Sequence, residues 1–145
     1  MMIDFENQTD LTVDIDALEI IASSLSTKEI ELLIINSQDM QILNRVHRGK
    51  DKSTDVLSFP LEEMTFEIAL PLGSVVICDS YVKEKALEFG HTQQDEISLL
   101  FIHGTLHLLG FDHELDNGEM RQKEEALIKK FSLPKSLIIR STLLK

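Results

Sequence analysis

Apolar and polar positions alternate with two different periods along the chain, and the two periods predict helices and strands in different stretches. Over residues 14–25 the apolar side chains recur three or four positions apart, as in Leu18, Ile21 and Leu25, which is typical of a helix with one buried face. The stretch EIELLII (residues 29–35) instead ends in a continuous apolar run, which indicates a strand buried on both faces. A helix followed by a buried strand is therefore predicted early in the chain.

The same criteria extend the prediction to the rest of the chain. Strands are predicted over residues 3–6, 29–35, 54–59 and 73–78, and helices over residues 14–25, 36–47, 80–89, 92–109 and 117–131. Pro60 is expected to stop the third strand, and Pro134 follows the last helix. Residues 61–70 fit neither period. The predicted order is strand, helix, strand, helix, two strands and then helices. This order indicates an α+β domain with one small mixed sheet surrounded by helices. A single domain over residues 1–145 is expected.

Composition places this domain among ordinary soluble proteins, because 43% of the residues are apolar and 27% are charged. No apolar run is long enough to span a bilayer, and the acidic N-terminal stretch MMIDFENQTDLTVDID has none of the features of a signal peptide. Cys78 is the single cysteine, so no internal disulfide can form. A cytoplasmic location is therefore expected.

Charge is unevenly distributed. The net charge of −11 argues against indiscriminate binding to nucleic acid, because a broad acidic surface repels phosphate. Residues 45–52, however, contain Arg45, His47, Arg48, Lys50 and Lys52 against Asp51 alone. A charged run taken singly is best interpreted as a solvated face. A basic run within an acidic chain nevertheless leaves room for a local cationic groove on an acidic body.

Three of the five histidines fall within the stretch HGTLHLLGFDH (residues 103–113). His103 and His107 are four positions apart on a predicted helix, so both rings project from one face, about one turn apart. Gly110 follows where the helix is expected to end, and the chain can then turn back and bring His113 to the same point. Three nitrogen ligands leave one position of a tetrahedral zinc ion open, as in catalytic zinc sites.

The spacing H-x-x-x-H-x-x-G-x-x-H is shared with metzincin metalloproteases, so a protease is the first alternative. Those enzymes carry a glutamate directly after the first histidine as the general base. Here that position is Gly104, which cannot accept a proton through a side chain. A peptidase of the usual mechanism is therefore not expected.

A three-histidine site favours an anionic ligand, because neutral imidazoles leave the full charge of the ion in place. Arg48 in the cationic segment can bind a phosphate through two parallel hydrogen bonds. From composition alone, however, Arg48 is more economically a solvated arginine at the end of a helix.

Two motifs resemble those of a known family. HGTLHLLGFDH resembles the H-G-x-L-H-L-x-G-Y/F-D-H motif of the YbeY family of bacterial endoribonucleases, also described as rRNA maturation factors. LNRVHRGKDKSTDVLSFP (residues 43–60) looks like the second motif of the same family. Both motifs lie at the usual places in a chain of the usual length, so the resemblance covers essentially the whole protein.

The resemblance implies a function that spacing and charge do not reveal. It implies that His103, His107 and His113 bind one Zn²⁺ ion, and that Arg48 matches the substrate-binding or catalytic arginine of the family. It also implies an RNA substrate, with a role in ribosomal RNA processing, notably of the 3′ end of 16S rRNA, and in ribosome quality control. The implied partners are the small ribosomal subunit and proteins bound to it.

Four further residues are candidates for the surroundings of the site. Asp112 is either a partner of a ligand or a proton acceptor, although capping of the turn is its simpler role. Thr54, Asp55 and Ser58 belong to the second motif and are candidates for the wall of the cleft. In one departure, this chain has Ser74 where the family usually has aspartate, so no catalytic carboxylate is assigned there.

The main hypothesis is therefore a zinc-dependent endoribonuclease with a preference for single strands. The nucleophile stays open between a water and the 2′-hydroxyl of the RNA. Two rival hypotheses stay open beside it: a metal-dependent protease or other hydrolase, and a non-enzymatic ribosome assembly factor whose metal is structural.

Overall fold

The computed structural model describes residues 2–61 and 71–144, and within these residues four strands form one mixed sheet. The strands are β1 (Ile3–Asn7), β2 (Ile30–Ile35), β3 (Val56–Pro60) and β4 (Gly73–Cys78), in the order β1-β2-β4-β3. β1, β2 and β4 are parallel, whereas the edge strand β3 runs antiparallel to β4. Apart from Leu61, the stretch 61–70 that fitted neither period lies outside the described residues.

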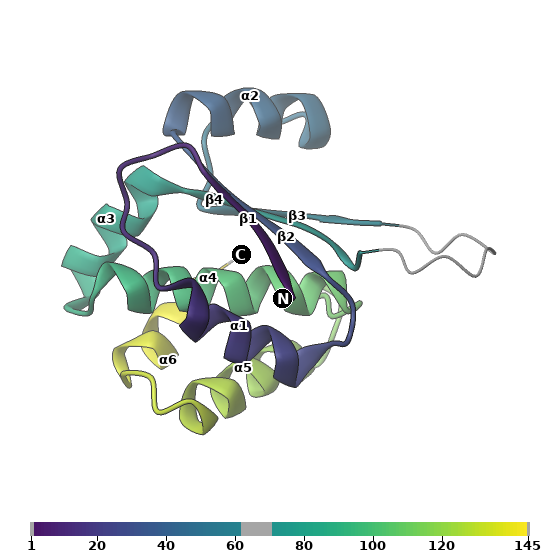
Figure 1. Cartoon of the computed structure of the whole chain (residues 1–145), viewed down its shortest axis with the longest axis vertical. Coiled ribbons are helices and arrows are strands. Elements are labelled where there is room, and N and C mark those ends of the chain that lie inside the picture. Colours follow the sequence, from purple (N-terminus) through teal and green to yellow (C-terminus); the bar gives the residue numbers. More distant parts are fainter. Residues whose placement is uncertain (1, 62–70, 145) are drawn as a thin grey trace.

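Six helices are described: α1 (Ile15–Leu25), α2 (Ser37–Arg48), α3 (Asp79–Phe89), α4 (Gln93–Leu108), α5 (Glu119–Lys130) and α6 (Ser136–Ser141). Figure 1 shows α2 on one face of the sheet and α1, α4, α5 and α6 on the other, with α4 directly beneath the strands. The parallel strands need crossover connections, and α1 supplies the first of them. The expected α+β fold, a small mixed sheet with helices around it, is confirmed.

α4 is the central helix, as its nearly continuous apolar sequence predicts. Every residue from Glu96 to Leu106 is buried. The helix begins with a capping box, in which the Thr92 side chain accepts from the backbone N–H of Asp95 and the Asp95 carboxylate accepts from that of Thr92. The histidine-bearing end of α4 is thus held by a rigid, buried scaffold.

The close packing of α4 on the sheet depends on Gly104. A Cβ atom at this position would lie 2.7 Å from Cγ1 of Val75 on β4 and 3.1 Å from Oγ of Ser58 on β3. Both distances are shorter than ordinary van der Waals contact. The Ser58 hydroxyl also donates to the Gly104 carbonyl at 2.9 Å. The absence of a side chain at position 104 therefore allows the histidine-bearing helix to pack directly onto β3 and β4.

Two details of the secondary structure differ from the sequence prediction. Helix α6 was not predicted, because six residues are too few to show a helical period, yet Leu137 and Arg140 in it are buried. β3 includes Pro60 instead of stopping before it. Proline is tolerated there because β3 is an edge strand and Pro60 is its last residue.

A buried network of charged groups joins α6 and α4 to the segment before β3. The Arg140 guanidinium donates to Oε2 of Glu96 at 3.0 Å and to Oδ2 of Asp55 at 2.9 Å. The second carboxylate oxygen of Glu96 contacts Nε2 of His91 at 2.9 Å. Such groups are tolerated in a core only when they are paired, and the pairing here fixes Asp55 against α6.

Candidate metal centre and cleft

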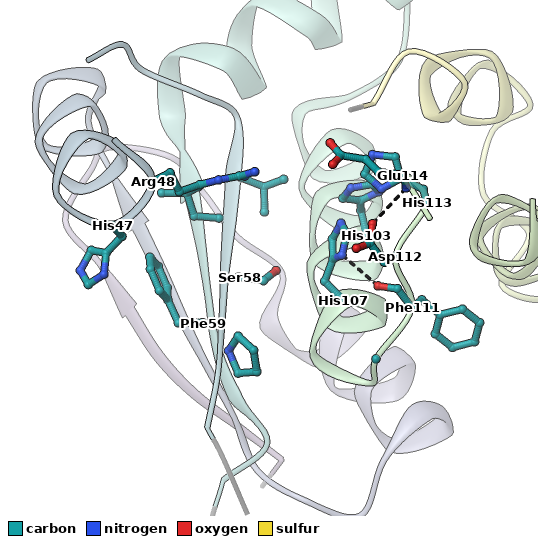
Figure 2. A pocket seen from close by; sticks show the side chains of 14 residues that line it. His47, Arg48, Ser58, Phe59, His103, His107, Phe111, Asp112, His113 and Glu114 are labelled. Carbon is teal, nitrogen blue, oxygen red and sulfur yellow. Dashed lines mark hydrogen bonds between the residues drawn. The ribbon is translucent and has the colours of Figure 1, made fainter. Parts of the chain in front are cut away.

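The three histidines of residues 103–113 lie together at the C-terminal end of α4. His103 and His107 are on the last turns of the helix, and the chain reverses after it at Gly110, whose φ of 99° is a conformation that glycine adopts readily. The backbone N–H of Phe111 then donates to the carbonyl of Leu106 at 3.0 Å. This reversal places the ring of His113 beside the rings of His103 and His107 (Figure 2).

The geometry of the three rings suits a single metal ion. One nitrogen from each ring lies within 4.8 Å of the others. The ring centroids of His103 and His107 are 4.8 Å apart, and His113 lies 5.2 Å from each. No other such cluster of histidine, cysteine and carboxylate groups is found in residues 2–61 and 71–144.

In two of the three rings, Nδ1 is hydrogen-bonded within the protein, and Nε2 is left free for a ligand. Nδ1 of His103 lies 2.6 Å from a carboxylate oxygen of Glu124, and Nδ1 of His107 lies 3.0 Å from the carbonyl oxygen of Phe111. With the Nδ1 proton donated in each case, Nε2 carries a lone pair and can bind a metal. Both nitrogens of His113 are buried and have no hydrogen-bond partner among the described residues. Because a buried polar atom without a partner is costly, a metal ion fits the chemistry of this donor set.

His107 is also in the protonation state that a metal-binding histidine requires. Burial lowers the pKa of His107 below its ordinary value, and the neighbouring rings of His103 and His113 lower it further. The lowered pKa keeps the imidazole neutral at physiological pH, and only the neutral ring can bind a metal.

The histidines form one wall of a cleft of about 500 Å³. The loop after α4, including Asp112 and Glu114, completes this wall, while the end of α2 and strand β3 form the opposite one. Figure 2 shows Arg48, the last residue of α2, extending from the opposite wall toward the histidines. Gly49 ends α2 in a left-handed conformation (φ 69°) directly after Arg48. The structure thus brings Arg48 to the same cleft as residues more than fifty positions away.

Two of the four other candidate residues line the cleft. Ser58 lies on the α4 side of β3, with its hydroxyl bound to the Gly104 carbonyl, and Asp112 lies in the loop after α4. The Asp112 carboxylate accepts from the backbone N–H of Glu114 at 3.0 Å, which is the simpler, turn-capping role. Thr54 and Asp55 are not among the lining residues. Asp55 is held by Arg140, and the Thr54 hydroxyl donates to the Asp55 carboxylate at 3.4 Å.

Ser74, at the position where aspartate was expected, does not reach the cleft. Its hydroxyl donates to a carboxylate oxygen of Glu31 at 2.7 Å, beside the Glu31–Ser74 pairing of β2 and β4. Side chains alternate between the faces of a strand, and the next residue, Val75, faces Gly104 on the α4 side. The serine therefore lies on the opposite face of the sheet and leaves the chemistry of the cleft unaffected.

Sequence reasoning missed three residues at this site. His47 and Glu114 line the cleft, and Glu124 reaches His103 from α5. Glu124 had a detectable signal: it occupies the apolar stripe of α5, between Met120 and Leu127, where a charged residue is unusual.

Comparisons with known proteins point to one family. The family model described as Endoribonuclease YbeY matches residues 4–132. Endoribonuclease YbeY of Sulfurimonas denitrificans is 58% identical over 140 residues, covering 97% of this chain and 99% of the relative. The Campylobacter jejuni protein of the same name is 61% identical over 126 residues, covering 87% and 92%. The solution structure of TM1509 from Thermotoga maritima superposes with a TM-score of 0.60 at 28% identity, covering 90% of this chain and 89% of that one.

Proposed function

The chain belongs to the YbeY family of endoribonucleases, and we propose that it is a zinc-dependent endoribonuclease that prefers single-stranded RNA. The family membership that the two motifs predicted is thereby confirmed. The observation that carries the proposal is a cleft with a cluster of three histidines on one wall and an arginine on the other. This is a suitable arrangement for a phosphodiester, which is anionic and must be bound, polarised and cleaved in one place.

His103, His107 and His113 are the proposed zinc ligands. Three neutral imidazoles and an open fourth position are typical of catalytic zinc, in agreement with the open cleft beside the rings. When bound, the ion supplies Lewis acidity for the scissile phosphate or for an attacking water. The free nitrogens of His113 and the neutral state of His107 support this assignment.

Arg48 is the proposed phosphate-binding residue. Its planar guanidinium can hold two oxygens of one phosphate and stabilise the charge that develops on them during cleavage. The side chain is exposed and directed across the cleft toward the histidines (Figure 2).

We further propose that the substrate is ribosomal RNA, that the partners are the small ribosomal subunit and proteins bound to it, and that the enzyme works in the cytoplasm. Family membership supports an RNA substrate. Described residues include no helix that could cross a membrane. The cationic segment of residues 45–52, next to the cleft, offers the local positive charge that an RNA phosphate backbone requires on an otherwise acidic protein.

Replacing Arg48 tests the proposed reaction. We expect Arg48→Ala to lower the cleavage rate of a single-stranded RNA by about 10²–10³-fold, because a preorganised charge at the phosphate is lost. Arg48→Lys restores only part of the activity, because an ammonium cannot make the paired contact. The readout is cleavage by zinc-loaded protein under single-turnover conditions.

Arg45→Ala is the matched control for this experiment. Arg45 lies on the same helix, three positions earlier, and pairs on the surface with Asp51 at 3.7 Å without lining the cleft. Arg45→Ala removes only general positive charge beside the cleft, so it should lower the cleavage rate only slightly. Equal losses from Arg45→Ala and Arg48→Ala would indicate a general contribution of positive charge and would contradict a specific role for Arg48.

A further inference from the structure

Glu124 is a carboxylate on the buried face of α5. Its neighbours on that face are Met120, Leu127 and Ile128, and only 2% of Glu124 is exposed. Transfer of a carboxylate into such surroundings is costly unless a strong partner compensates for the lost water. Neither catalysis nor the proposed contacts with RNA involve this residue, so its burial calls for a separate explanation.

The partner of Glu124 is one of the three clustered histidines. A carboxylate oxygen of Glu124 lies 2.6 Å from Nδ1 of His103, and the two side chains are exposed by only 3% and 4%. A contact this short between buried groups is typical of a charge-assisted hydrogen bond. It joins α5 to α4 at the site itself.

We propose that Glu124 is a positioning residue of the metal centre, an inference that rests on the proposed function. By accepting the Nδ1 proton of His103, the carboxylate fixes the tautomer in which Nε2 carries the lone pair, and it fixes the rotation of the ring. The negative charge beside Nδ1 also strengthens electron donation from Nε2 to a bound ion.

The other hydrogen-bonded histidine of the cluster provides an internal comparison. His107 is oriented by the backbone carbonyl of Phe111, a neutral acceptor that no side-chain substitution removes. His113 has no hydrogen-bond partner on either nitrogen among the described residues. Within the described part of the chain, His103 alone of the three rings is held by a charged side chain, so Glu124 is the position at which the support of the cluster can be changed by mutation.

Glu124→Leu and Glu124→Gln test the role. Leucine keeps the shape of the apolar stripe and removes the acceptor. Glutamine can accept the proton through its amide oxygen but carries no charge. We expect the affinity for Zn²⁺, measured by competition with a chelating dye, to fall about 10–100-fold in the leucine variant and by less in the glutamine variant. The absorption spectrum of the Co²⁺-loaded protein reports whether the ligand geometry has changed.

Glu125→Gln is the matched control. Glu125 is the adjacent carboxylate of α5, and it pairs with Lys129 at 3.1 Å on the surface. This variant should bind zinc like the wild type. Thermal unfolding of the metal-free proteins is measured in parallel, and we expect both Glu124 variants to be folded and α-helical before metal is added.

Three outcomes would overturn the role of Glu124. In the first, both Glu124 variants bind zinc with wild-type affinity. In the second, the loss of zinc affinity in each variant is fully explained by unfolding of its metal-free form, which would make the contact structural. In the third, the wild type itself binds no zinc, which would contradict the metal centre of the proposed function. Because the readout is metal affinity, a failure of RNA cleavage alone leaves the positioning role standing.

Discussion

We expect His107→Ala to bind no stoichiometric zinc and to cleave RNA at least about 10³-fold more slowly than the wild type. The loss of one of three ligands removes the Lewis acid, which contributes several kcal/mol of transition-state stabilisation. His107 is the best of the three positions for this test. The side chain is half-buried, and among the described residues its ring makes one hydrogen bond, to the Phe111 carbonyl, so its removal should leave the domain folded. His103→Ala would instead leave Glu124 buried without its partner.

Zinc content by elemental analysis, unfolding by circular dichroism and cleavage of a labelled single-stranded RNA together measure this effect. His47→Ala is the control, since His47 lines the same cleft but does not belong to the three-histidine cluster. It should retain one zinc per chain. A His107→Ala protein that still holds one equivalent of zinc would rule out the assignment of the ligands.

Gly104→Glu, which installs the glutamate of the metzincin motif, is expected to destabilise the domain severely and to create no peptidase. The new Cβ would meet Cγ1 of Val75 at 2.7 Å, and overpacking of this kind costs about 1–3 kcal/mol. The carboxylate would also enter the interface between α4 and the sheet without a partner, at a cost of several kcal/mol more. The sum is comparable to the whole stability of a small domain, which is about 5–15 kcal/mol.

Chemical denaturation and a peptide hydrolysis assay check this prediction, with Gly104→Ala as the graded control. The alanine variant carries the steric conflict without the charge, so it should lose about 1–3 kcal/mol and stay folded. A stable, zinc-loaded Gly104→Glu protein that hydrolyses a peptide would revive the protease hypothesis. Position 104 faces Val75 and Ser58 on the sheet, so a side chain there would not point at the substrate, and the protease alternative fails for this geometric reason as well.

The histidine cluster could be predicted from the sequence because it is local. The interval of four between His103 and His107 is a property of any helix, and Gly110 marks the reversal that brings in His113. The core elements were predictable for the same reason, since the continuous run of β2 and the periodic run of α1 each reflect nearby residues. Such patterns require no knowledge of how distant parts of the chain meet.

Contacts between distant segments were not predictable in this way. Arg48 reaches the cleft only because α2 and α4 pack on opposite faces of the sheet near the edge strand β3, and composition alone favoured a solvated arginine. The family resemblance, not the pattern, singled it out. Asp55 was expected near the cleft but pairs with Arg140, eighty-five positions later. The partner of Glu124 is likewise decided by the packing of α5 on α4.

Two functions on the ribosome have to be distinguished by experiment: that of an enzyme with a catalytic zinc, and that of an assembly factor with a structural zinc. The core of the described residues favours the former, because α4 is buried by apolar contacts with the sheet and with α5, independently of the histidines. A structural zinc would instead contribute a large part of the folding free energy. The metal-free protein is therefore expected to remain folded.

The decisive measurement is the cleavage of a single-stranded RNA by one preparation in three states: zinc-loaded, stripped of zinc with a chelator, and reloaded with zinc. Circular dichroism is recorded in each state. A catalytic zinc predicts that cleavage disappears and returns with the metal while the helical signal persists. Cleavage that continues unchanged in folded, zinc-free protein would contradict a metal-dependent endoribonuclease, and unfolding upon removal of zinc would identify the metal as structural.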